Sequence, residues 1–466
     1  MGVLPTFERV TLPADFVDRL RAAFGEAVHV TDAMLAQHGS SESHFATMLP
    51  HVVVFAKSTD EVVRLVKLCG EAGVPIVPFG AGTSIEGNAA PVKGGVSLNL
   101  SGMNRIVAVN AEDFDCTVEA GVRREELNHH LRDQGLFFPI DPGANATIGG
   151  MASTRASGTN AVRYGTMREA VLSLTVVTPQ GEVVRTARRA RKSAAGYDLT
   201  RLYVGSEGTL GIITEVTLRL HPIPETISSA VCGFETLAGA VDTVVQSIQL
   251  GVPLARVEIL DDMQMRAVNA WAKLDYPEVT TLFFEFHGTE SYVAEQIATV
   301  REIASTNGGS EFAWSNLPEE RSRLWKARHE AYYAAVNLRP GAIGWATDVC
   351  VPISRLAECI GETKRDLEAA SMPATILGHV GDGNFHVVFS IDPNAPHEMA
   401  EVEEINARLI ERAIDMDGTC TGEHGIGIGK QHWLVAELGD AVEVMRTLKR
   451  ALDPRDLFNP GKIFSL

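Results

Sequence analysis

The fold of this chain is decided by the stretch Gly378-His379-Val380-Gly381-Asp382-Gly383-Asn384-Phe385-His386. Apolar runs flank it at residues 374–377 and 387–389. An Asp-Gly pair between two apolar runs predicts a β-hairpin with a two-residue turn. Folding the chain about Asp382-Gly383 pairs His379 with His386. Directly opposed residues share one face of a sheet, with Cβ atoms roughly 5 Å apart.

Two histidines at this separation suit one metal ion, because N–metal bonds are about 2.0–2.1 Å long. A third ligand is expected in Gly422-Glu423-His424-Gly425, where Glu423 is the best candidate. Two histidines and a carboxylate leave one coordination position open for substrate. The same ligands also suit a metal hydrolase or a non-haem iron oxygenase. A packed histidine pair without a metal is the other reading of the hairpin.

Length and composition limit the function classes. The chain has 466 residues, which suggests two or three domains, and its hydrophobic content of 45% is ordinary for a globular protein. The formal charge of −18 argues against nucleic acid and anionic membrane as partners. Six scattered cysteines without a Cys-x-x-Cys pair indicate reduced thiols and no iron–sulfur cluster.

The sequence also bears on location. No apolar run approaches the roughly 18 residues of a membrane span. The first residues lack the charged-then-apolar pattern of a signal peptide. We therefore expect a cytoplasmic protein, with peripheral attachment at the inner membrane through a partner as the alternative.

Two kinds of element pattern divide the chain. Alternating strands and helices between residues 51 and 220 indicate an α/β domain, with a strand expected at 202–205 and a long loop at 140–166. Prolines in His221-Pro222-Ile223-Pro224 mark a plausible boundary. Beyond it, single strands between long helices indicate an antiparallel sheet with helices on one face, an α+β domain.

Three glycine-rich loops of the α/β domain point to a phosphate-bearing ligand. They cover residues 75–88, 141–165 and 205–211. Glycines let successive backbone N–H groups point at an anion, and Thr83 and Ser84 add hydroxyls. The first loop has neither Rossmann nor P-loop spacing, which argues against nicotinamide. One such loop is equally explained by a tight turn, but three favour a dinucleotide.

Five motifs follow one another along the chain: Pro-Phe-Gly-Ala-Gly-Thr-Ser (78–84), Gly-Ser-Glu-Gly-Thr-Leu-Gly (205–211), Gly-His-Val-Gly-Asp-Gly-Asn-Phe-His (378–386), Gly-Thr-Cys-Thr-Gly-Glu-His-Gly-Ile-Gly (418–427) and Asn-Pro-Gly-Lys (459–462). Together they resemble the FAD-linked 2-hydroxy-acid dehydrogenases of the vanillyl-alcohol-oxidase type. The resemblance covers the chain from about residue 45 onward. It is closest to the cytochrome-linked branch that oxidises D-lactate, with the D-2-hydroxyglutarate and glycolate branches as sisters.

The resemblance implies an α+β protein with a two-part α/β FAD-binding domain at 1–223, a substrate-binding cap at 224–415 and a C-terminal segment, 416–466, that returns to the FAD domain. The FAD-binding residues that it implies are Pro78, Gly80, Ala81, Gly82, Thr83, Ser84, Gly87, Pro142, Gly143, Thr147, Gly149, Gly150, Ser157, Gly158, Tyr164, Glu207, Gly208, Gly211, Ile213 and Asn459. Neither the 78–88 loop nor the 142–165 loop contains a histidine, so we expect FAD to be noncovalent.

The resemblance also assigns chemical roles. A divalent metal, Zn or Mn, on His379, His386 and Glu423 would lower the pKa of the substrate hydroxyl. His424 would be the base that takes its proton. Glu423 and His424 can converge only if their glycine-flanked segment is irregular. Arg328 would bind the substrate carboxylate, although without the resemblance it reads as a surface residue.

The expected substrate is a small D-2-hydroxy acid with an apolar side chain. The relatives that oxidise 2-hydroxyglutarate carry a lysine and an asparagine where this chain has Ala346 and Val388. A second carboxylate would therefore meet apolar groups, which is unfavourable. The electron acceptor is expected to be a cytochrome, a quinone or an electron-transfer flavoprotein. A homodimer is the assembly considered.

Overall fold

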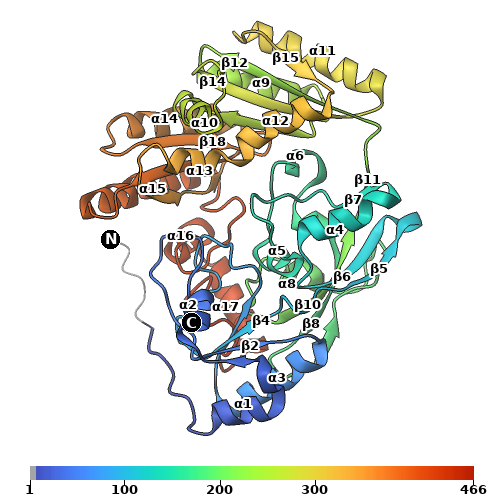
Figure 1. The fold of residues 1–466 in the computed structure, drawn as a ribbon, viewed down its shortest axis with the longest axis vertical. Helices are drawn as coiled ribbons and strands as arrows, with labels where there is room; N and C mark the ends of the chain where they lie inside the picture. The colour runs from blue at the N-terminus through green and yellow to red at the C-terminus, as the bar shows by residue number, and fades with distance from the viewer. Residues whose placement is uncertain (1–6) are drawn as a thin grey trace. The chain divides into compact units, whose positions relative to one another are not determined.

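The computed structural model describes residues 7–466, which form two compact units (Figure 1). The terminal unit consists of the described residues up to Ser157, Gly165–Ile223 and Glu423–Leu466. The central unit consists of Gly158–Tyr164 and Pro224–Gly422. Two short segments, 158–164 and 416–422, thus pack with the central unit although the expected ranges placed them outside it. Residues 1–6 of the expected first domain lie outside the described residues.

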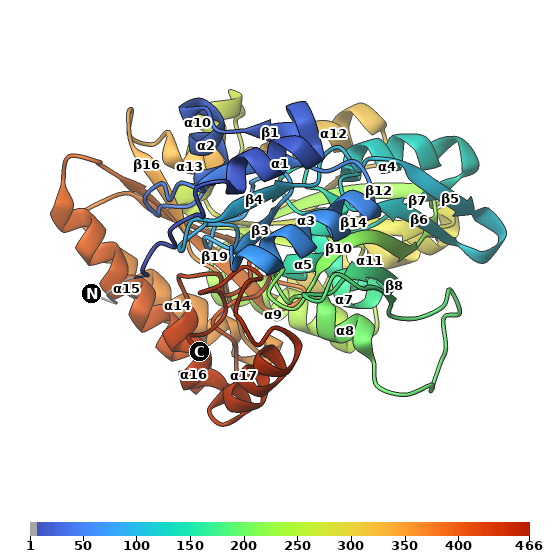
Figure 2. The same ribbon diagram turned by 90° about the horizontal axis from the view of Figure 1, so that it is seen from below.

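The first sheet of the terminal unit has the strand order β1-β2-β4-β3, drawn in blue in Figure 2. Strands β2, β3 and β4 are parallel, and their residues are buried almost throughout, as expected for a parallel sheet. The elements are α1 Phe16–Phe24, β1 Val28–His29, α2 Asp32–Gly39, β2 Val52–Phe55, α3 Thr59–Ala72, β3 Ile76–Phe79 and β4 Val96–Asn99. Helix α3 starts where Ser58 accepts a hydrogen bond from Glu61 N–H, and it ends at Gly73 with φ 68°.

The second sheet of this unit is antiparallel, with the order β5-β6-β10-β8-β9. Its strands are β5 Ile106–Asn110, β6 Asp115–Glu119, β8 Val171–Val177, β9 Val183–Arg185 and β10 Ile212–Arg219. Strands β7 Leu136–Phe137 and β11 His221–Pro222 form a separate two-stranded sheet. The other helices of this unit are α4 Arg124–Leu131, α5 Ile148–Thr154, α7 Met167–Ala170, α8 Leu199–Tyr203, α16 Gln431–Leu438 and α17 Ala441–Leu452. The C-terminal tail returns to the first sheet, because Phe458 forms a β-bridge with Ile76.

Two sequence predictions for this unit were wrong. Residues 202–205 do not form a strand, since helix α8 occupies 199–203. The expected loop at 140–166 contains helix α5. A Cβ on Gly149 would lie 2.5 Å from the Cβ of Ala120, so this helix needs glycine to approach strand β6 closely. Its glycines, serine and threonine have low helix propensity, and tertiary packing compensates for it.

The central unit is built on one antiparallel sheet with the order β15-β12-β14-β13-β18-β19-β16. Its elements are α6 Ala161–Tyr164, β12 Thr226–Phe234, α9 Leu237–Gln249, β13 Arg256–Leu260, α10 Asp262–Ala272, β14 Thr280–Gly288, α11 Glu290–Thr306, β15 Ala313–Ser315, α12 Pro318–His329, α13 Ala331–Val336, β16 Ile343–Ala346, β17 Val349–Cys350, α14 Leu356–Glu368, β18 Ala374–Gly378, β19 Asn384–Ile391 and α15 Pro396–Asp415.

Helices cover both faces of this sheet, so the prediction of helices on one face was wrong. Residues 280–287 of β14 are all buried, and successive residues of a strand point to opposite faces. Helices α10, α12 and α13 pack in a cluster with Leu260, Phe283, Leu377 and Val388. Helices α9 and α11 contact β12 and β14 without entering that cluster. The sheet face that α12 covers carries Glu258, which contacts Arg328 of that helix.

The hairpin β18–β19 exists, but its register differs from the prediction. Leu377 pairs with His386, so the pairing is symmetric about Gly381-Asp382, and Asp382 N–H donates to His379 O over 3.0 Å within the connection. Gly383 O instead accepts from Val351 N–H, outside the hairpin. The slip is two residues, which leaves every side chain on its expected face.

Candidate active site

The two hairpin histidines lie side by side in the central unit. Their ring centroids are 5.5 Å apart, and the residues are 9% and 7% exposed. His379 Nδ1 is 2.7 Å from Glu258 Oε1, and His386 Nδ1 is 2.9 Å from Thr347 O. Both partners only accept, so each ring donates from Nδ1, and the neutral form of each ring has its lone pair on Nε2. Metal-ligating histidines are oriented in this way. The pair therefore fits a metal ion.

Glu258 connects His379 to Arg328. It is fully buried on β13, and its Oε2 accepts a hydrogen bond from Arg328 Nε at 2.8 Å; Arg328 Nη2 lies 2.6 Å from the same oxygen in an ion pair. Burial raises the pKa of Glu258, but the charges and hydrogen bonds of His379 and Arg328 outweigh this effect and hold it below its ordinary value. Glu258 is thus an ionised carboxylate between two predicted site residues.

Arg328 lies on the inner side of α12 and is 8% exposed, not the surface residue that its charged helix suggested. Its guanidinium has five N–H donors; the one on Nε is hydrogen-bonded to Glu258, and Nη2 is ion-paired with the same carboxylate. Among residues 7–466, the remaining donors of Arg328 have no other hydrogen-bond acceptor. A buried guanidinium with unused donors can bind a carboxylate of a ligand.

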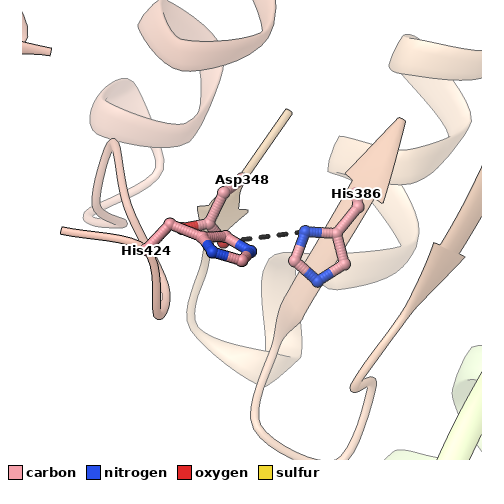
Figure 3. A group of neighbouring side chains, drawn as sticks. All are labelled: Asp348, His386 and His424. Carbon is pink, nitrogen blue, oxygen red and sulfur yellow. Dashed lines mark ion pairs between the residues drawn. The ribbon is translucent and has the colours of Figure 1, made fainter. Parts of the chain in front are cut away.

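Asp348 lies beside His386 and binds Gly422, the residue at which the central unit ends along the chain. Figure 3 draws the 3.8 Å contact between Asp348 Oδ1 and His386 Nδ1 as a dashed line, and it also labels His424, which belongs to the terminal unit. Asp348 is fully buried and accepts hydrogen bonds from Asn384 Nδ2, Thr421 Oγ1 and Gly422 N–H, each at 2.8 Å. Gly422 is therefore anchored next to the histidine pair.

Glu423 and His424 are the first residues of the chain after Gly422. His424 Nε2 lies 3.7 Å from Glu423 Oε1, so the two side chains converge. The segment is irregular because Gly425 and Gly427 have φ of 77° and 51°. His424 O accepts a hydrogen bond from Asn88 Nδ2 over 3.1 Å, which ties its backbone to the terminal unit.

The predicted FAD residues of the terminal unit come from segments that the fold brings together. A Cβ on Gly80 would lie 2.3 Å from Thr147 Oγ1, and one on Gly208 would lie 2.9 Å from Pro78 Cγ. Asn459 Nδ2 donates to Asn88 O and Glu207 O over 2.8 and 2.6 Å. The unit contains Pro78, Gly80, Ala81, Gly82, Thr83, Ser84, Gly87, Pro142, Gly143, Thr147, Gly149, Gly150, Ser157, Glu207, Gly208, Gly211, Ile213 and Asn459.

Glu207 joins these segments through its side chain. Its carboxylate accepts hydrogen bonds from Asn88 Nδ2 and from the backbone N–H groups of Ile426 and Gly427. Burial raises the pKa of Glu207 to about 7, although these donors and Lys462 act in the opposite direction. Glu207 therefore holds the glycine segment around residue 426 against the first loop.

The first glycine loop has backbone donors to spare. Within residues 7–466, no backbone N–H of residues 81–85 donates a hydrogen bond, and Gly82 has φ 74°. Buried side-chain oxygens without a partner in the same range include Asn88 Oδ1, Ser206 Oγ and Asn459 Oδ1. Consecutive free N–H groups next to a glycine with positive φ form an anion-binding loop. The loop fits the phosphates of a dinucleotide such as FAD.

Gly158 and Tyr164, also predicted to bind FAD, belong to the central unit. Tyr164 OH lies 2.8 Å from His287 Nδ1, and His287 Nε2 lies 2.8 Å from Glu285 Oε1. The charges of Arg256 and His287 outweigh burial and lower the pKa of Glu285 to about 2. This hydrogen-bonded series, in which Glu285 and His287 are buried and Tyr164 is half-buried, was not foreseen from the sequence.

Ala346 and Val388, the two substrate-side residues, form a direct cross-strand pair. Val388 is two residues from His386 on β19 and so shares its face. Val388 is 2% exposed and packs with Trp325 and Leu377. This part of the face is apolar.

Sequence reasoning missed Glu258 and Asp348. Both are charged residues next to apolar strand residues, in Val257-Glu258-Ile259 and in Asp348-Val349. Charged side chains are almost never fully buried unless they are paired, so their place inside a buried strand pattern was the available signal.

Comparisons with known proteins identify two family models in this chain. The family model "FAD linked oxidases, C-terminal domain" matches residues 223–463, and the model "FAD binding domain" matches residues 50–187. FAD is thus the cofactor of the domain that contains the first two glycine loops. No helix within residues 7–466 is long and apolar enough to cross a membrane.

Two curated relatives carry similar names. The chain is 54% identical to "Probable D-lactate dehydrogenase, mitochondrial" of Danio rerio, over 97% of this chain and 92% of the relative. It is 50% identical to "D-lactate dehydrogenase [cytochrome], mitochondrial" of Arabidopsis thaliana, over 91% of this chain and 76% of the relative. Both names place those relatives in mitochondria, and a cytoplasmic location of this chain stays a prediction.

A solved structure of p-cresol methylhydroxylase with bound substrate shares the fold, with a TM-score of 0.79, 18% identity and coverage of 98% of this chain and 99% of the other. The predicted vanillyl-alcohol-oxidase-type fold, with mixed helices and sheets and a second part built on an antiparallel sheet, is confirmed.

Proposed function

We propose a function from the premise that this chain belongs to the family of FAD-linked oxidases. It is an FAD-dependent dehydrogenase that oxidises a small D-2-hydroxy acid, D-lactate first, to the 2-oxo acid. The observation that carries the proposal is the buried group of two Nδ1-protonated histidines and one arginine with unused donors. The names of the two relatives support D-lactate.

Residues 1–223 and 416–466 would hold FAD, and residues 224–415 would form the substrate cap. The match to an FAD binding domain and the free N–H groups of the first loop support this division. FAD would accept the hydride from the substrate Cα at flavin N5. Because neither FAD loop contains a histidine, the cofactor is noncovalent.

His379 and His386 would supply two ligands of a divalent metal, Zn or Mn, and Glu423 the third. Glu423 follows Gly422 directly, and consecutive Cα atoms are about 3.8 Å apart, so the anchoring of Gly422 by Asp348 supports this choice. Such a metal would supply Lewis-acid polarisation of the substrate hydroxyl.

The chain's own side chains would handle the carboxylate and the proton. Arg328 would bind the substrate carboxylate through the donors that Glu258 leaves unused. His424 would take the hydroxyl proton, since a neutral imidazole is an effective base near pH 7. The electron acceptor would be a cytochrome, a quinone or an electron-transfer flavoprotein, and the word cytochrome in one relative's name supports the first.

Removal of the metal tests this function. A strong chelator should abolish D-lactate oxidation while the flavin absorbance stays with the protein. Added Zn²⁺ or Mn²⁺ should restore the wild type but not His386→Ala. The matched control is His397→Ala, a histidine exposed on α15, which should behave as wild type. Full activity of a metal-free His386→Ala protein would refute the metal site, and a colourless purified protein would refute the flavin.

A further inference from the structure

We infer that Glu258 is the positioning residue that fixes the ring tautomer of His379 and so makes its Nε2 available to a metal. The inference rests on the metal site proposed above. Nothing in the sequence motifs or in the relatives' names points to this glutamate. It acts through the histidine, from the neighbouring strand β13.

The geometry leaves the carboxylate of Glu258 one orientation. Arg328 Nε donates a hydrogen bond to Oε2 at 2.8 Å, and Arg328 Nη2 lies 2.6 Å from the same oxygen. This pairing turns Oε1 toward His379 Nδ1 at 2.7 Å. Since the glutamate is fully buried, no water competes for Oε1, and an ionised oxygen can only accept. His379 must therefore carry its proton on Nδ1.

A glutamine at this position would reverse the arrangement. Arg328 has only donors, so the amide oxygen must face it. The amide NH₂ then faces His379 Nδ1, which has to become an acceptor. The ring proton moves to Nε2, the nitrogen that a metal needs. Glu258→Gln keeps the size of the side chain and one bond to Arg328, and it changes the tautomer.

A second glutamate of the same sheet provides a matched control. Glu285 on β14 is also buried, with Arg256 Nε at 3.5 Å and His287 Nε2 at 2.8 Å. However, His287 uses its other nitrogen for Tyr164 OH at 2.8 Å, so both of its ring nitrogens have protein partners. The two clusters have the same residue types, and only one leads to a predicted ligand.

The experiment measures Zn²⁺ binding, not activity. The FAD-containing protein is stripped of metal with a chelator, and its Zn²⁺ affinity is determined by competition with a chromophoric chelator. Loss of a partner behind a metal ligand typically costs 10–100-fold in affinity, and we expect that loss for Glu258→Gln. Glu285→Gln should stay within about twofold of wild type, the usual scatter for independent sites. His379→Ala gives the affinity without this ligand.

A measurement on the unmutated protein covers the case in which Glu258→Gln does not fold. Histidine labelled with ¹⁵N reports the tautomer of each ring, and His379→Ala assigns the signal. We expect His379 of the metal-free protein to be protonated on Nδ1 above pH 8. Protonation on Nε2 would overturn the inference.

The outcomes separate this inference from the proposed function. If His379→Ala weakens Zn²⁺ binding but Glu258→Gln does not, the metal site stands and the role of Glu258 is wrong. If Glu285→Gln weakens binding as much as Glu258→Gln, the effect is general electrostatics and the inference fails. If His379→Ala leaves Zn²⁺ binding unchanged, the metal site and the inference are both refuted.

Discussion

Each compact unit has a buried glutamate at its hub, and the two differ in the partners that surround it. Glu207 of the terminal unit accepts from backbone N–H groups and an asparagine amide. Glu258 of the central unit accepts from Arg328 and faces His379. The pKa of Glu207 is raised, whereas that of Glu258 is lowered. The N–H donors and the charge of Lys462 do not offset the burial of Glu207, whereas an arginine and a histidine in direct contact offset the burial of Glu258.

The difference reflects how each unit is built. Glu207 holds backbone segments in place, and in the terminal unit the groups that can bind a phosphate-bearing ligand are mainly backbone N–H groups. Glu258 fixes side chains, so the central unit works through groups that carry chemistry. Substitutions of individual residues can test this contrast between backbone groups in the terminal unit and side chains in the central unit.

Substitution of His424 should have the largest effect, because this residue is the proposed general base. It also tests the division between the units, since it belongs to the terminal unit but acts through its side chain. His424→Ala keeps the backbone oxygen that accepts from Asn88, so flavin should stay bound. Turnover of D-lactate should fall by roughly 10²–10⁴, the usual contribution of a general base. Steady-state kinetics with an artificial electron acceptor, across pH 6–9, measures the loss.

The control for this variant is the metal and flavin content, which should equal that of wild type. Turnover within a few-fold of wild type at every pH would move the role of base to another residue. Loss of flavin from His424→Ala would instead mean that the His424 side chain helps to bind FAD. Its role would then resemble that of the other residues of the terminal unit.

Substrate choice tests the claim that side chains of the central unit decide the chemistry. The pair Ala346–Val388 offers a distal carboxylate no partner. A penalty of about 3–4 kcal/mol corresponds to roughly 10²–10³ in kcat/KM in favour of D-lactate over D-2-hydroxyglutarate. Ala346→Lys should narrow this ratio, because it adds a cation to the face.

Four substrates decide the matter: D-lactate, D-2-hydroxybutyrate, glycolate and D-2-hydroxyglutarate. We expect the first two to be similar and glycolate to be poorer, because it buries no methyl group. Should D-2-hydroxyglutarate or glycolate prove best, the substrate assignment is wrong, whatever the fate of the flavin and metal assignments.

Local signals were sufficient for much of this picture. The glycine loops predicted an anion-binding cradle, and the hairpin predicted two histidines on one face. That second prediction survived an error in register, because a slip of two residues preserves the faces of a strand. The register itself depends on Gly383 O bonding to Val351 N–H, a contact between segments more than thirty residues apart that no local pattern encodes.

The features that sequence reasoning missed are long-range in the same sense. Helix α5 reads as a loop, since its glycines serve its close approach to Ala120 and not its own stability. Glu258 meets His379 only when β13 pairs with β18. A charged residue within an apolar strand pattern predicts that it has a partner, but the sequence does not show which residue that partner is.

The smallest expected effect is on the pH dependence of stability. It compares Glu207, whose pKa is raised, with a buried glutamate whose pKa is lowered. Because the folded pKa of Glu207 is about 7, above the unfolded value of 4.5, the folded state binds a proton more tightly than the unfolded state. Stability should therefore decrease as pH rises from 5 to 6.5, by roughly 1–3 kcal/mol. This window lies below the pKa of Lys462, which burial lowers to about 7. Glu207→Gln, which cannot ionise, should lose that decrease in urea unfolding of the FAD-containing protein.

Glu285→Gln is the control, and it carries the opposite sign. The pKa of Glu285 is lowered to about 2, from an ordinary value of 4.5. The stability that its ionised form contributes is complete above the unfolded value and is lost only as pH falls toward 2. The slope between pH 5 and 6.5 should then be the same in this variant and in wild type. If Glu207→Gln keeps the wild-type slope, the carboxylate of Glu207 is ionised throughout the window, and the N–H donors together with Lys462 suffice to stabilise the buried charge. The contrast between the two units would then lie in geometry alone.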